Sequence, residues 1–147
     1  MYDLIIIGAG ITGQTAAIYA ARKRMKFLLL AREIGGQFLE SGAIFNYPGI
    51  VKTTGVEFSA IMEEQLAFNG ISPREGEEAR GIERIPGGFR VQCAGGGYEA
   101  KAVIVATGAR ARKLGVPGED RLARRGVTYC SICDGPLFAG MDIAIVG

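Results

Sequence analysis

Residues 2–13, YDLIIIGAGITG, place an apolar run directly before a turn that contains three glycines. The run Tyr2–Ile7 is continuous and rich in branched side chains, which indicates a buried strand of a parallel sheet. Thr12–Arg24 follows with alanines and helix formers, and its basic end suits a helix C-terminus. Lys26–Ala31 is a second apolar run. These segments together predict a βαβ unit of an α/β fold.

The spacing Gly8-Ala9-Gly10-Ile11-Thr12-Gly13 fits the turn that holds the pyrophosphate of a dinucleotide. In such a turn Gly8 lets the chain reverse sharply, Gly10 lets the backbone approach the pyrophosphate, and Gly13 lets helix and strand pack closely. The helix N-terminus then offers unpaired N–H groups to the anion. A plain tight turn is the alternative, and the position between strand and helix favours dinucleotide binding.

An acidic residue near the end of the second strand would hold the ribose of such a dinucleotide. Glu33 lies just beyond Arg32, where we expect that strand to end. Glu33 could serve from the loop, or backbone groups could replace it. A solvated surface glutamate is an equal alternative.

The middle of the chain changes from long apolar segments to short ones separated by glycine turns. Gly55–Phe68 is expected to form a second helix that ends at Asn69 and Gly70. Three short runs indicate an antiparallel meander, at residues 78–85, 88–93 and 97–101. Two further apolar runs predict parallel strands, at residues 102–106 and 142–146. A loop is expected at residues 35–49 and a linker at residues 109–120.

The composition is that of an ordinary soluble globular protein, with 147 residues, 48% apolar and 22% charged. A net charge of +2 is too small to indicate nucleic acid or a membrane surface as partner. No apolar run is long enough to span a membrane, and the N-terminus lacks the basic region of a signal peptide. The three cysteines, an odd number, favour the reducing cytoplasm.

A second motif, Cys130-Ser131-Ile132-Cys133-Asp134, sets two thiols close together with a carboxylate directly behind them. A dithiol must release and regain protons as it cycles between its redox states. The chain has no histidine, so Asp134 is the obvious proton carrier, and Ser-His and Cys-His nucleophile pairs are excluded. Together with the glycine turn, the motif suggests that electrons pass from a bound cofactor into a disulfide.

Three other interpretations of the cysteine pair are weaker. A zinc site needs four ligands, and only Cys93 remains to add to the pair. A structural disulfide would be strained over so short a loop, in a compartment that is reducing. A pair of inert buried cysteines is the plainest alternative, and Cys93 itself is most simply a small core residue.

These residues resemble the low-molecular-weight, FAD-dependent thioredoxin reductases of the pyridine nucleotide-disulfide oxidoreductase family. The resemblance covers nearly the whole chain, and the order and spacing of the motifs make it specific. The motifs are Gly8–Gly13; Gly35-Gly36-Gln37; Asn46-Tyr47-Pro48-Gly49; Ala106-Thr107-Gly108-Ala109; Pro117-Gly118-Glu119; and Gly126–Gly135 with the cysteine pair.

The resemblance implies a Rossmann-like FAD-binding domain, with a parallel sheet and a small antiparallel meander. The Gly8–Gly13 turn would hold the pyrophosphate, and Gly35, Gly36 and Gln37 would lie near the adenosine. Asn46 and the segment Ala106-Thr107-Gly108 would border the cofactor further along.

In that family NADPH reduces the flavin, and the flavin reduces the disulfide. The resemblance implies that Cys133 faces the flavin, Cys130 attacks the partner's disulfide, and Asp134 acts as acid and base. The partner would be thioredoxin or a similar small redox protein, and the parent enzyme a homodimer.

The family chains are roughly twice as long, so the resemblance is to a truncated, N-terminal fragment. Residues 1–115 would be the first part of the FAD domain, and residues 116–147 a linker and the start of the domain that carries the disulfide and NADPH. The NADPH site would be missing. The open alternatives are a partial FAD-binding module without turnover, and a flavin reductase serving a peroxiredoxin-linked protein or ferredoxin. Ferredoxin-directed relatives lack the cysteine pair, which lowers the last option.

Overall fold

The computed structural model describes residues 1–123, 125–130 and 135–147. The chain forms two compact units, Met1–Gly108 and Ala109–Gly147. The functional boundary predicted between residues 115 and 116 stays a prediction.

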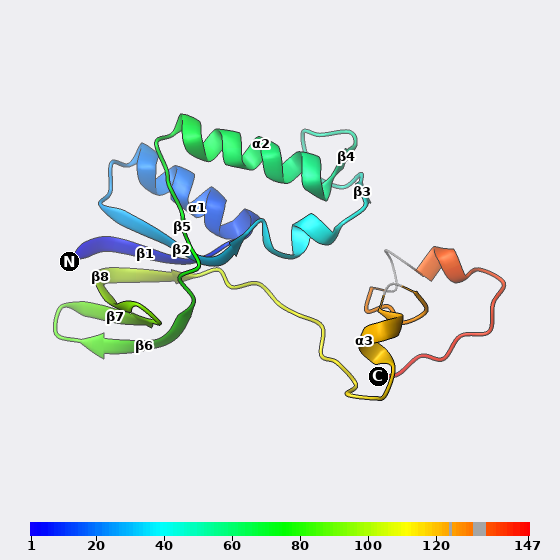
Figure 1. The fold of residues 1–147 in the computed structure, drawn as a ribbon. Coiled ribbons are helices and arrows are strands. Elements are labelled where there is room, and N and C mark those ends of the chain that lie inside the picture. Colours follow the sequence, from blue (N-terminus) through cyan, green and yellow to red (C-terminus); the bar gives the residue numbers. More distant parts are fainter. Residues whose placement is uncertain (124, 131–134) are drawn as a thin grey trace. The chain divides into compact units, whose positions relative to one another are not determined.

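The first unit is built on a mixed sheet of six strands in the order β5-β2-β1-β8-β7-β6 (Figure 1). Three neighbouring pairs, β5–β2, β2–β1 and β1–β8, are parallel, whereas β8–β7 and β7–β6 are antiparallel. The strands are β1 (Tyr2–Ala9), β2 (Phe27–Ile34), β5 (Arg74–Glu75), β6 (Ala79–Ile85), β7 (Gly88–Cys93) and β8 (Gly96–Val105). The predicted α/β fold with a meander is therefore confirmed.

Strand β8 joins the parallel and antiparallel parts of the sheet. Its Ala100 is paired with Tyr2 of β1 on one side and with Phe89 of β7 on the other. The prediction of two separate strands, at residues 97–101 and 102–106, was wrong, because no turn residue interrupts the run from Tyr98 to Val105. The meander is thus fixed in register to the central strand of the unit.

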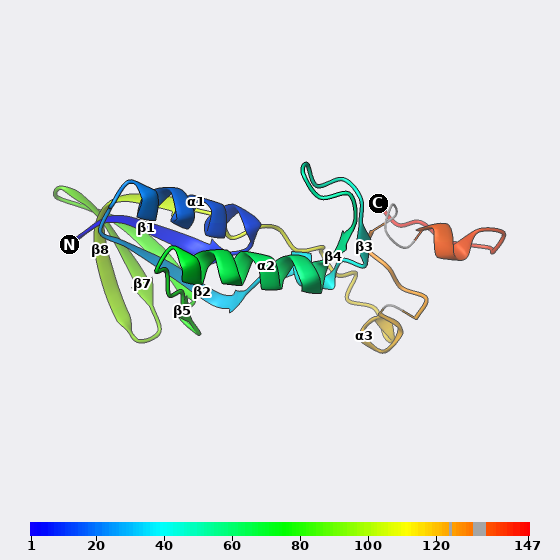
Figure 2. The ribbon, with the colours of Figure 1, turned by 90° about the horizontal axis from the view of Figure 1, so that it is seen from above.

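Two helices cover one face of the sheet, α1 (Ile11–Arg22) and α2 (Gly55–Phe68) (Figures 1 and 2). Between them and the sheet lies a core that includes Leu4, Ile6, Ala17, Leu29 and Leu66, all buried. Alanines on α1 allow that helix to approach the sheet closely. The predicted second helix is confirmed, with the bounds that the sequence indicates.

Helix α2 begins with a capping box. The Thr54 hydroxyl accepts a hydrogen bond from the Glu57 N–H at 3.2 Å, and the Glu57 carboxylate accepts one from the Thr54 N–H at 2.9 Å. Each bond satisfies a backbone donor that the first helical turn leaves without an intrahelical partner. This fixes where the helix starts.

The other face of β1 is covered by the meander. Ile5 and Ile7 point away from the helices and pack with Leu30, Val91 and Ala100, which are all buried. Because side chains alternate along a strand, β1 buries both of its faces, as its continuous apolar sequence predicts. The carboxyl end of β1 is therefore held rigidly between two cores.

The segment between β2 and α2 is partly ordered by short elements and aromatic contacts. It contains the 3-10 helix η1 (Gly36–Glu40) and a small hairpin of β3 (Ala43–Ile44) and β4 (Thr53–Thr54). The ring of Phe58 on α2 lies 4.7 Å from the ring centroid of Phe38 and 4.5 Å from that of Tyr47. The predicted loop at residues 35–49 thus contains more structure than the sequence indicates.

The second unit contains only short helices among its described residues, α3 (Glu119–Leu122) and η2 (Gly135–Phe138). The strand predicted at Asp142–Val146 is wrong: these residues have no regular structure, and Ile143, Ile145 and Val146 are exposed. An apolar run forms a strand only where a neighbouring strand satisfies its backbone. In the described part of the chain, no helix is long and apolar enough to cross a membrane.

Candidate functional site

The glycine turn lies between the carboxyl end of β1 and the start of α1, and two of its glycines are required by the packing of the chain itself. A Cβ atom at Gly8 would lie 2.3 Å from the Ala106 carbonyl oxygen, and one at Gly13 would lie 1.7 Å from the Gly8 carbonyl oxygen. Gly8 also has a φ of +103°. These two residues therefore let three backbone segments meet at one point.

Gly10 is different, because nothing in the chain requires it to lack a side chain. A Cβ at Gly10 would meet only the Gly35 carbonyl oxygen, at 4.0 Å, and the φ of Gly10 is −76°. Gly10 is the N-cap of α1, and no side chain caps that helix. The turn therefore has free space and unpaired N–H groups where the sequence predicts the pyrophosphate.

Gln14 is a residue of this site that the sequence interpretation missed. Its side chain is 1% exposed, and its Nε2 donates to the Ala9 carbonyl oxygen at 2.9 Å. Its Oε1 is buried without a hydrogen-bond partner among the described residues. A buried unpaired amide oxygen is costly and suggests a donor supplied from outside the chain. Its position directly behind the GxGxxG turn is the signal that could have singled it out.

Two other predicted segments meet the glycine turn. The Gly35 N–H donates to the Ala9 carbonyl oxygen at 2.8 Å, and the Ala106 N–H donates to the Ile7 carbonyl oxygen at 2.8 Å. A Cβ at Gly36 would lie 3.7 Å from the Gly10 Cα. The carboxyl ends of the parallel strands β1, β2 and β8 thus bring together Gly8, Ala9, Gly10, Ile11, Thr12, Gly13, Gly35, Gly36 and Ala106, with the Thr107 backbone alongside.

The remaining predicted cofactor residues lie at the rim or outside this cluster. Gln37, Thr107 and Gly108 are exposed, and Asn46 is exposed in the loop between β3 and β4. Their contact with a cofactor stays a prediction.

Glu33 lies within strand β2, which continues to Ile34, so the predicted end of that strand at Arg32 was too early. The strand is longer because Gly35, bonded to Ala9, keeps it beside β1. The exposed Glu33 carboxylate forms an ion pair with Arg32 at 2.8 Å. Glu33 therefore has the placement expected of a ribose ligand, and that role stays a prediction.

The cysteine motif is described only in part. Cys130 is disulfide-bonded, and its N–H donates to the Thr128 hydroxyl at 3.3 Å. Cys133, which the family resemblance assigns as the flavin-facing sulfur, and Asp134, the predicted proton carrier, lie outside the described residues. Their roles stay predictions.

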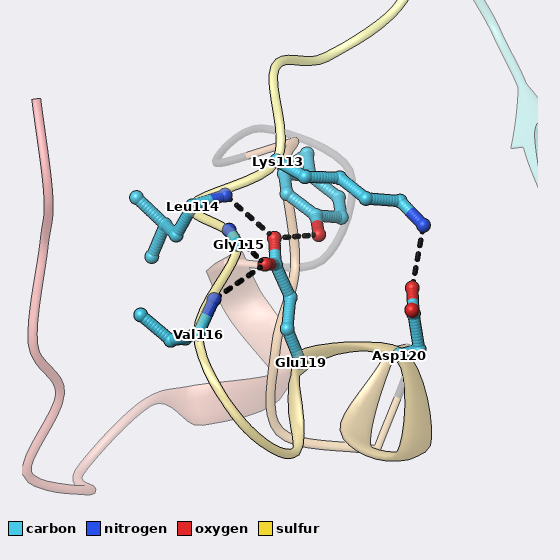
Figure 3. Close-up of polar contacts among 7 residues, drawn as sticks. Lys113, Leu114, Gly115, Val116, Glu119 and Asp120 are labelled. Atoms are coloured by element: carbon cyan, nitrogen blue, oxygen red, sulfur yellow. Dashed lines mark hydrogen bonds and ion pairs between the residues drawn. The ribbon is translucent and has the colours of Figure 1, made fainter.

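A buried carboxylate lies just before this motif, and the sequence interpretation gave it no role. Glu119 is 4% exposed and accepts hydrogen bonds from the N–H groups of Leu114, Gly115 and Val116 and from the Tyr129 hydroxyl (Figure 3). The bond from Tyr129 and the backbone N–H groups lower the pKa of Glu119, and the bond to Glu119 raises the pKa of Tyr129 to about 12.

The third cysteine, Cys93, is the free cysteine of the described residues and packs at the edge of the meander core. Burial and the nearby Glu77 carboxylate raise the pKa of its thiol. A thiol held in its neutral form is a poor nucleophile, which agrees with a packing role. Among the described residues, no group of three or more metal-ligating side chains could hold a metal ion.

A parallel strand, a GxGxxG turn and a helix in this arrangement define a dinucleotide-binding domain of the Rossmann type. The profile of one family, the pyridine nucleotide-disulphide oxidoreductases, matches residues 2–147. The chain belongs to this family.

Both curated relatives and solved structures resemble this chain. Alkyl hydroperoxide reductase F of Staphylococcus epidermidis is 42% identical over 147 residues, which cover 99% of this chain and 29% of the relative. The protein of that name from Staphylococcus aureus is 40% identical with the same coverage. The chain thus spans less than a third of the curated relatives that it matches.

Among solved structures, thioredoxin reductase of Lactococcus lactis has a TM-score of 0.78 and 42% identity, over 94% of this chain and 46% of that one. A ferredoxin-flavin thioredoxin reductase of Clostridium acetobutylicum has a TM-score of 0.72 and 33% identity, over 95% and 48%. These likenesses confirm the predicted thioredoxin-reductase-like fold, in a chain that spans about half of each solved one.

Proposed function

We propose that this chain supplies the FAD-binding half and the redox disulfide of a flavoprotein disulfide reductase. The observation that carries the proposal is the contrast within the glycine turn. Gly8 and Gly13 are required by internal packing, whereas Gly10 leaves space at the uncapped N-terminus of α1. A turn needed only for folding would require no glycine at position 10.

The residues present fit FAD. The free N–H groups at the start of α1 suit a pyrophosphate, and the unpaired Gln14 Oε1 suits a donor brought by the cofactor or by a water molecule bound with it. Gly35 and Gly36 provide a second backbone segment, at the start of η1, beside the turn. When bound, FAD would carry electrons between a reduced nicotinamide nucleotide and the protein disulfide.

The residues of the second unit would carry out thiol chemistry. Under the proposal, Cys133 receives electrons from the flavin, Cys130 attacks the disulfide of the acceptor, and Asp134 exchanges the protons. NADPH would bind to a part of the whole protein that this chain does not include. A homodimer in the cytoplasm remains part of the proposal.

The acceptor is proposed to be thioredoxin or a similar small redox protein. Solved structures named as thioredoxin reductases support this candidate, at up to 42% identity, to the same degree as the relatives below support the second. A second candidate is the acceptor of an alkyl hydroperoxide reductase, because relatives with that name reach the same identity. The similarity of this half alone favours neither.

Two experiments test the proposal. Titration of FAD with the 147-residue chain should quench flavin fluorescence in a saturable way, and no saturation would overturn the cofactor assignment. The longer protein that contains this chain should then reduce thioredoxin with NADPH, and both Cys130→Ser and Cys133→Ser should abolish that transfer. Faster reduction of a peroxiredoxin than of thioredoxin would select the second candidate.

A further inference from the structure

The Glu119 carboxylate is held by groups from two directions. On one side lie three successive backbone N–H groups, with distances of 2.9 Å from Leu114, 2.7 Å from Gly115 and 3.4 Å from Val116. Successive N–H groups that converge in this way form an anion-binding concavity. On the other side the Tyr129 hydroxyl donates to Glu119 Oε1.

These contacts link the segment 114–116 to the residue immediately before Cys130 (Figure 3). Other bonds hold the same stretch: the Val127 N–H donates to the Leu122 carbonyl oxygen at 3.0 Å, and Ala123 forms a β-bridge with Val127. Helix α3, which starts at Glu119, therefore contacts the chain that leads to Cys130 at two successive places.

The Glu119 carboxylate is an unusual group for a contact that only fills space. Glu119 is almost fully buried, and burial of a carboxylate is unfavourable unless hydrogen bonds satisfy it. Both of its oxygens are satisfied, and the Tyr129 ring remains 45% exposed, so the hydroxyl contact rather than ring burial determines where Tyr129 lies. The contact therefore fixes a backbone position more than it fills a core.

We propose that Glu119 and Tyr129 are positioning residues for Cys130: the buried carboxylate holds the Tyr129 hydroxyl and thereby restrains the backbone that carries Cys130 in a geometry suited to its disulfide. The inference rests on the proposed function for its biological meaning. A restraint on the backbone of Cys130 favours formation of its disulfide, because the chain then loses less conformational entropy when the bond closes. Without the restraint, the disulfide becomes easier to reduce.

The test measures the disulfide equilibrium of the 147-residue chain with dithiothreitol, without FAD. Reduction transfers two electrons and two protons from the two thiols of the reagent, which becomes a cyclic disulfide, to the two sulfurs of the chain. Tyr129→Phe and Glu119→Gln should each raise the equilibrium constant for reduction about fivefold, the size expected for loss of one hydrogen bond. The double variant should show no more than the larger single effect.

Asp120→Asn is the matched control. Asp120 is the neighbouring carboxylate, it is exposed, and it pairs with Lys113. Its substitution should change the equilibrium constant by less than about twofold, because exposed ion pairs contribute little. A change as large as that of Glu119→Gln would indicate a general charge effect and overturn the proposal.

NMR of chain labelled at the tyrosine Cζ atoms shows whether the contact itself has been lost. In Glu119→Gln the pKa of Tyr129 should fall from about 12 toward 10.0. An unchanged dithiothreitol equilibrium in a variant that has lost the contact would overturn the proposal. Tyr129→Phe keeps the ring and decides the question if Glu119→Gln does not fold. Because no flavin is involved, a failure here is distinct from a failure to bind FAD.

Discussion

The Gly8 carbonyl oxygen lies 1.7 Å from the position that a Cβ atom would take at Gly13. At Gly13, helix α1 therefore meets the end of strand β1 backbone to backbone. Real Cβ atoms essentially never approach an oxygen so closely, so any side chain at residue 13 must push the helix away from the sheet.

Gly13→Ala is expected to destabilise the first unit by about 3 kcal/mol or more, because the added methyl group meets backbone that cannot rotate aside. Urea denaturation followed by circular dichroism measures this. The control is Gly42→Ala, where a Cβ would meet nothing within 4 Å. The control should stay within about 0.5 kcal/mol of the original chain. Equal stability of the two variants would contradict the packing described here.

Gly10→Ala is expected to leave the fold nearly intact and to weaken FAD binding. Its Cβ has space in the chain, so the expected loss of stability is about 1 kcal/mol or less, from a poorer N-cap. The same methyl group would occupy space proposed for the pyrophosphate. Titration of flavin fluorescence should show a Kd at least about tenfold higher, equivalent to about 1.4 kcal/mol. Gly42→Ala again serves as control. An unchanged Kd for Gly10→Ala would contradict binding of the pyrophosphate at this turn.

Thr54→Ala is expected to destabilise the first unit by about 1 kcal/mol, because it removes the side-chain cap of α2. Glu57→Ala should also destabilise it, and the double variant should lose less than the sum of the two, since both side chains belong to one capping box. Thermal denaturation of all three variants gives these values. Glu64→Ala, at an exposed position of the same helix, is the control. Simple additivity would contradict a shared cap.

The Cys93 thiol is expected to react slowly with iodoacetamide at neutral pH. Burial first, and then the Glu77 carboxylate, raise its pKa above 9.0, so the reactive thiolate is scarce. Alkylation measured by mass spectrometry should therefore be slower in the folded than in the denatured chain. Glu77→Gln should speed it, whereas Glu78→Gln should not. A folded Cys93 as reactive as the denatured thiol would refute this assignment.

Acidification is expected to break the Glu119–Tyr129 contact only at a pH below 4.5, the ordinary pKa of the carboxyl group. The pKa of Glu119 is lower in the folded chain, chiefly because the Tyr129 hydroxyl donates to it. The stabilisation is therefore fully present above pH 4.5 and is lost as the pH falls through the lower, folded value. The Cζ resonance of Tyr129 reports the transition by NMR, and Tyr129→Phe identifies that resonance. A midpoint above 4.5 would contradict the shift.

The strands and helices next to long apolar runs could be predicted from the sequence. The continuous apolar run Tyr2–Ile7 predicts a buried strand, although β1 continues through Gly8 to Ala9. The segment Gly55–Phe68 predicts α2 with its observed bounds. The spacing of Thr54 and Glu57 is also the sequence signature of a capping box. The strand predicted at Asp142–Val146 is wrong, because an apolar run does not indicate whether a neighbouring strand is present to pair with it.

The candidate site likewise has features that the sequence predicts and features that depend on the folded structure. The glycine spacing predicts the turn and a separate role for each glycine, and the folded structure adds which backbone atoms surround each one. The hydrogen bonds of Glu119 could not be predicted, because they join residues from an irregular backbone that has no periodic pattern. The unpaired oxygen of Gln14 likewise depends on the tertiary packing around it.

The continuity of strand β8 restricts where the sequence can gain or lose residues. The hairpin turns at Pro86–Gly87 and Ala94–Gly95 lie outside the paired residues, so an insertion at either tip would leave the pairing unchanged. One residue added between Ala100 and Val105 would turn each following side chain to the opposite face and displace Ala106 from Gly8. Over evolutionary time, length changes should therefore accumulate at the tips of the meander and be rejected in the stretch that leads to the glycine turn.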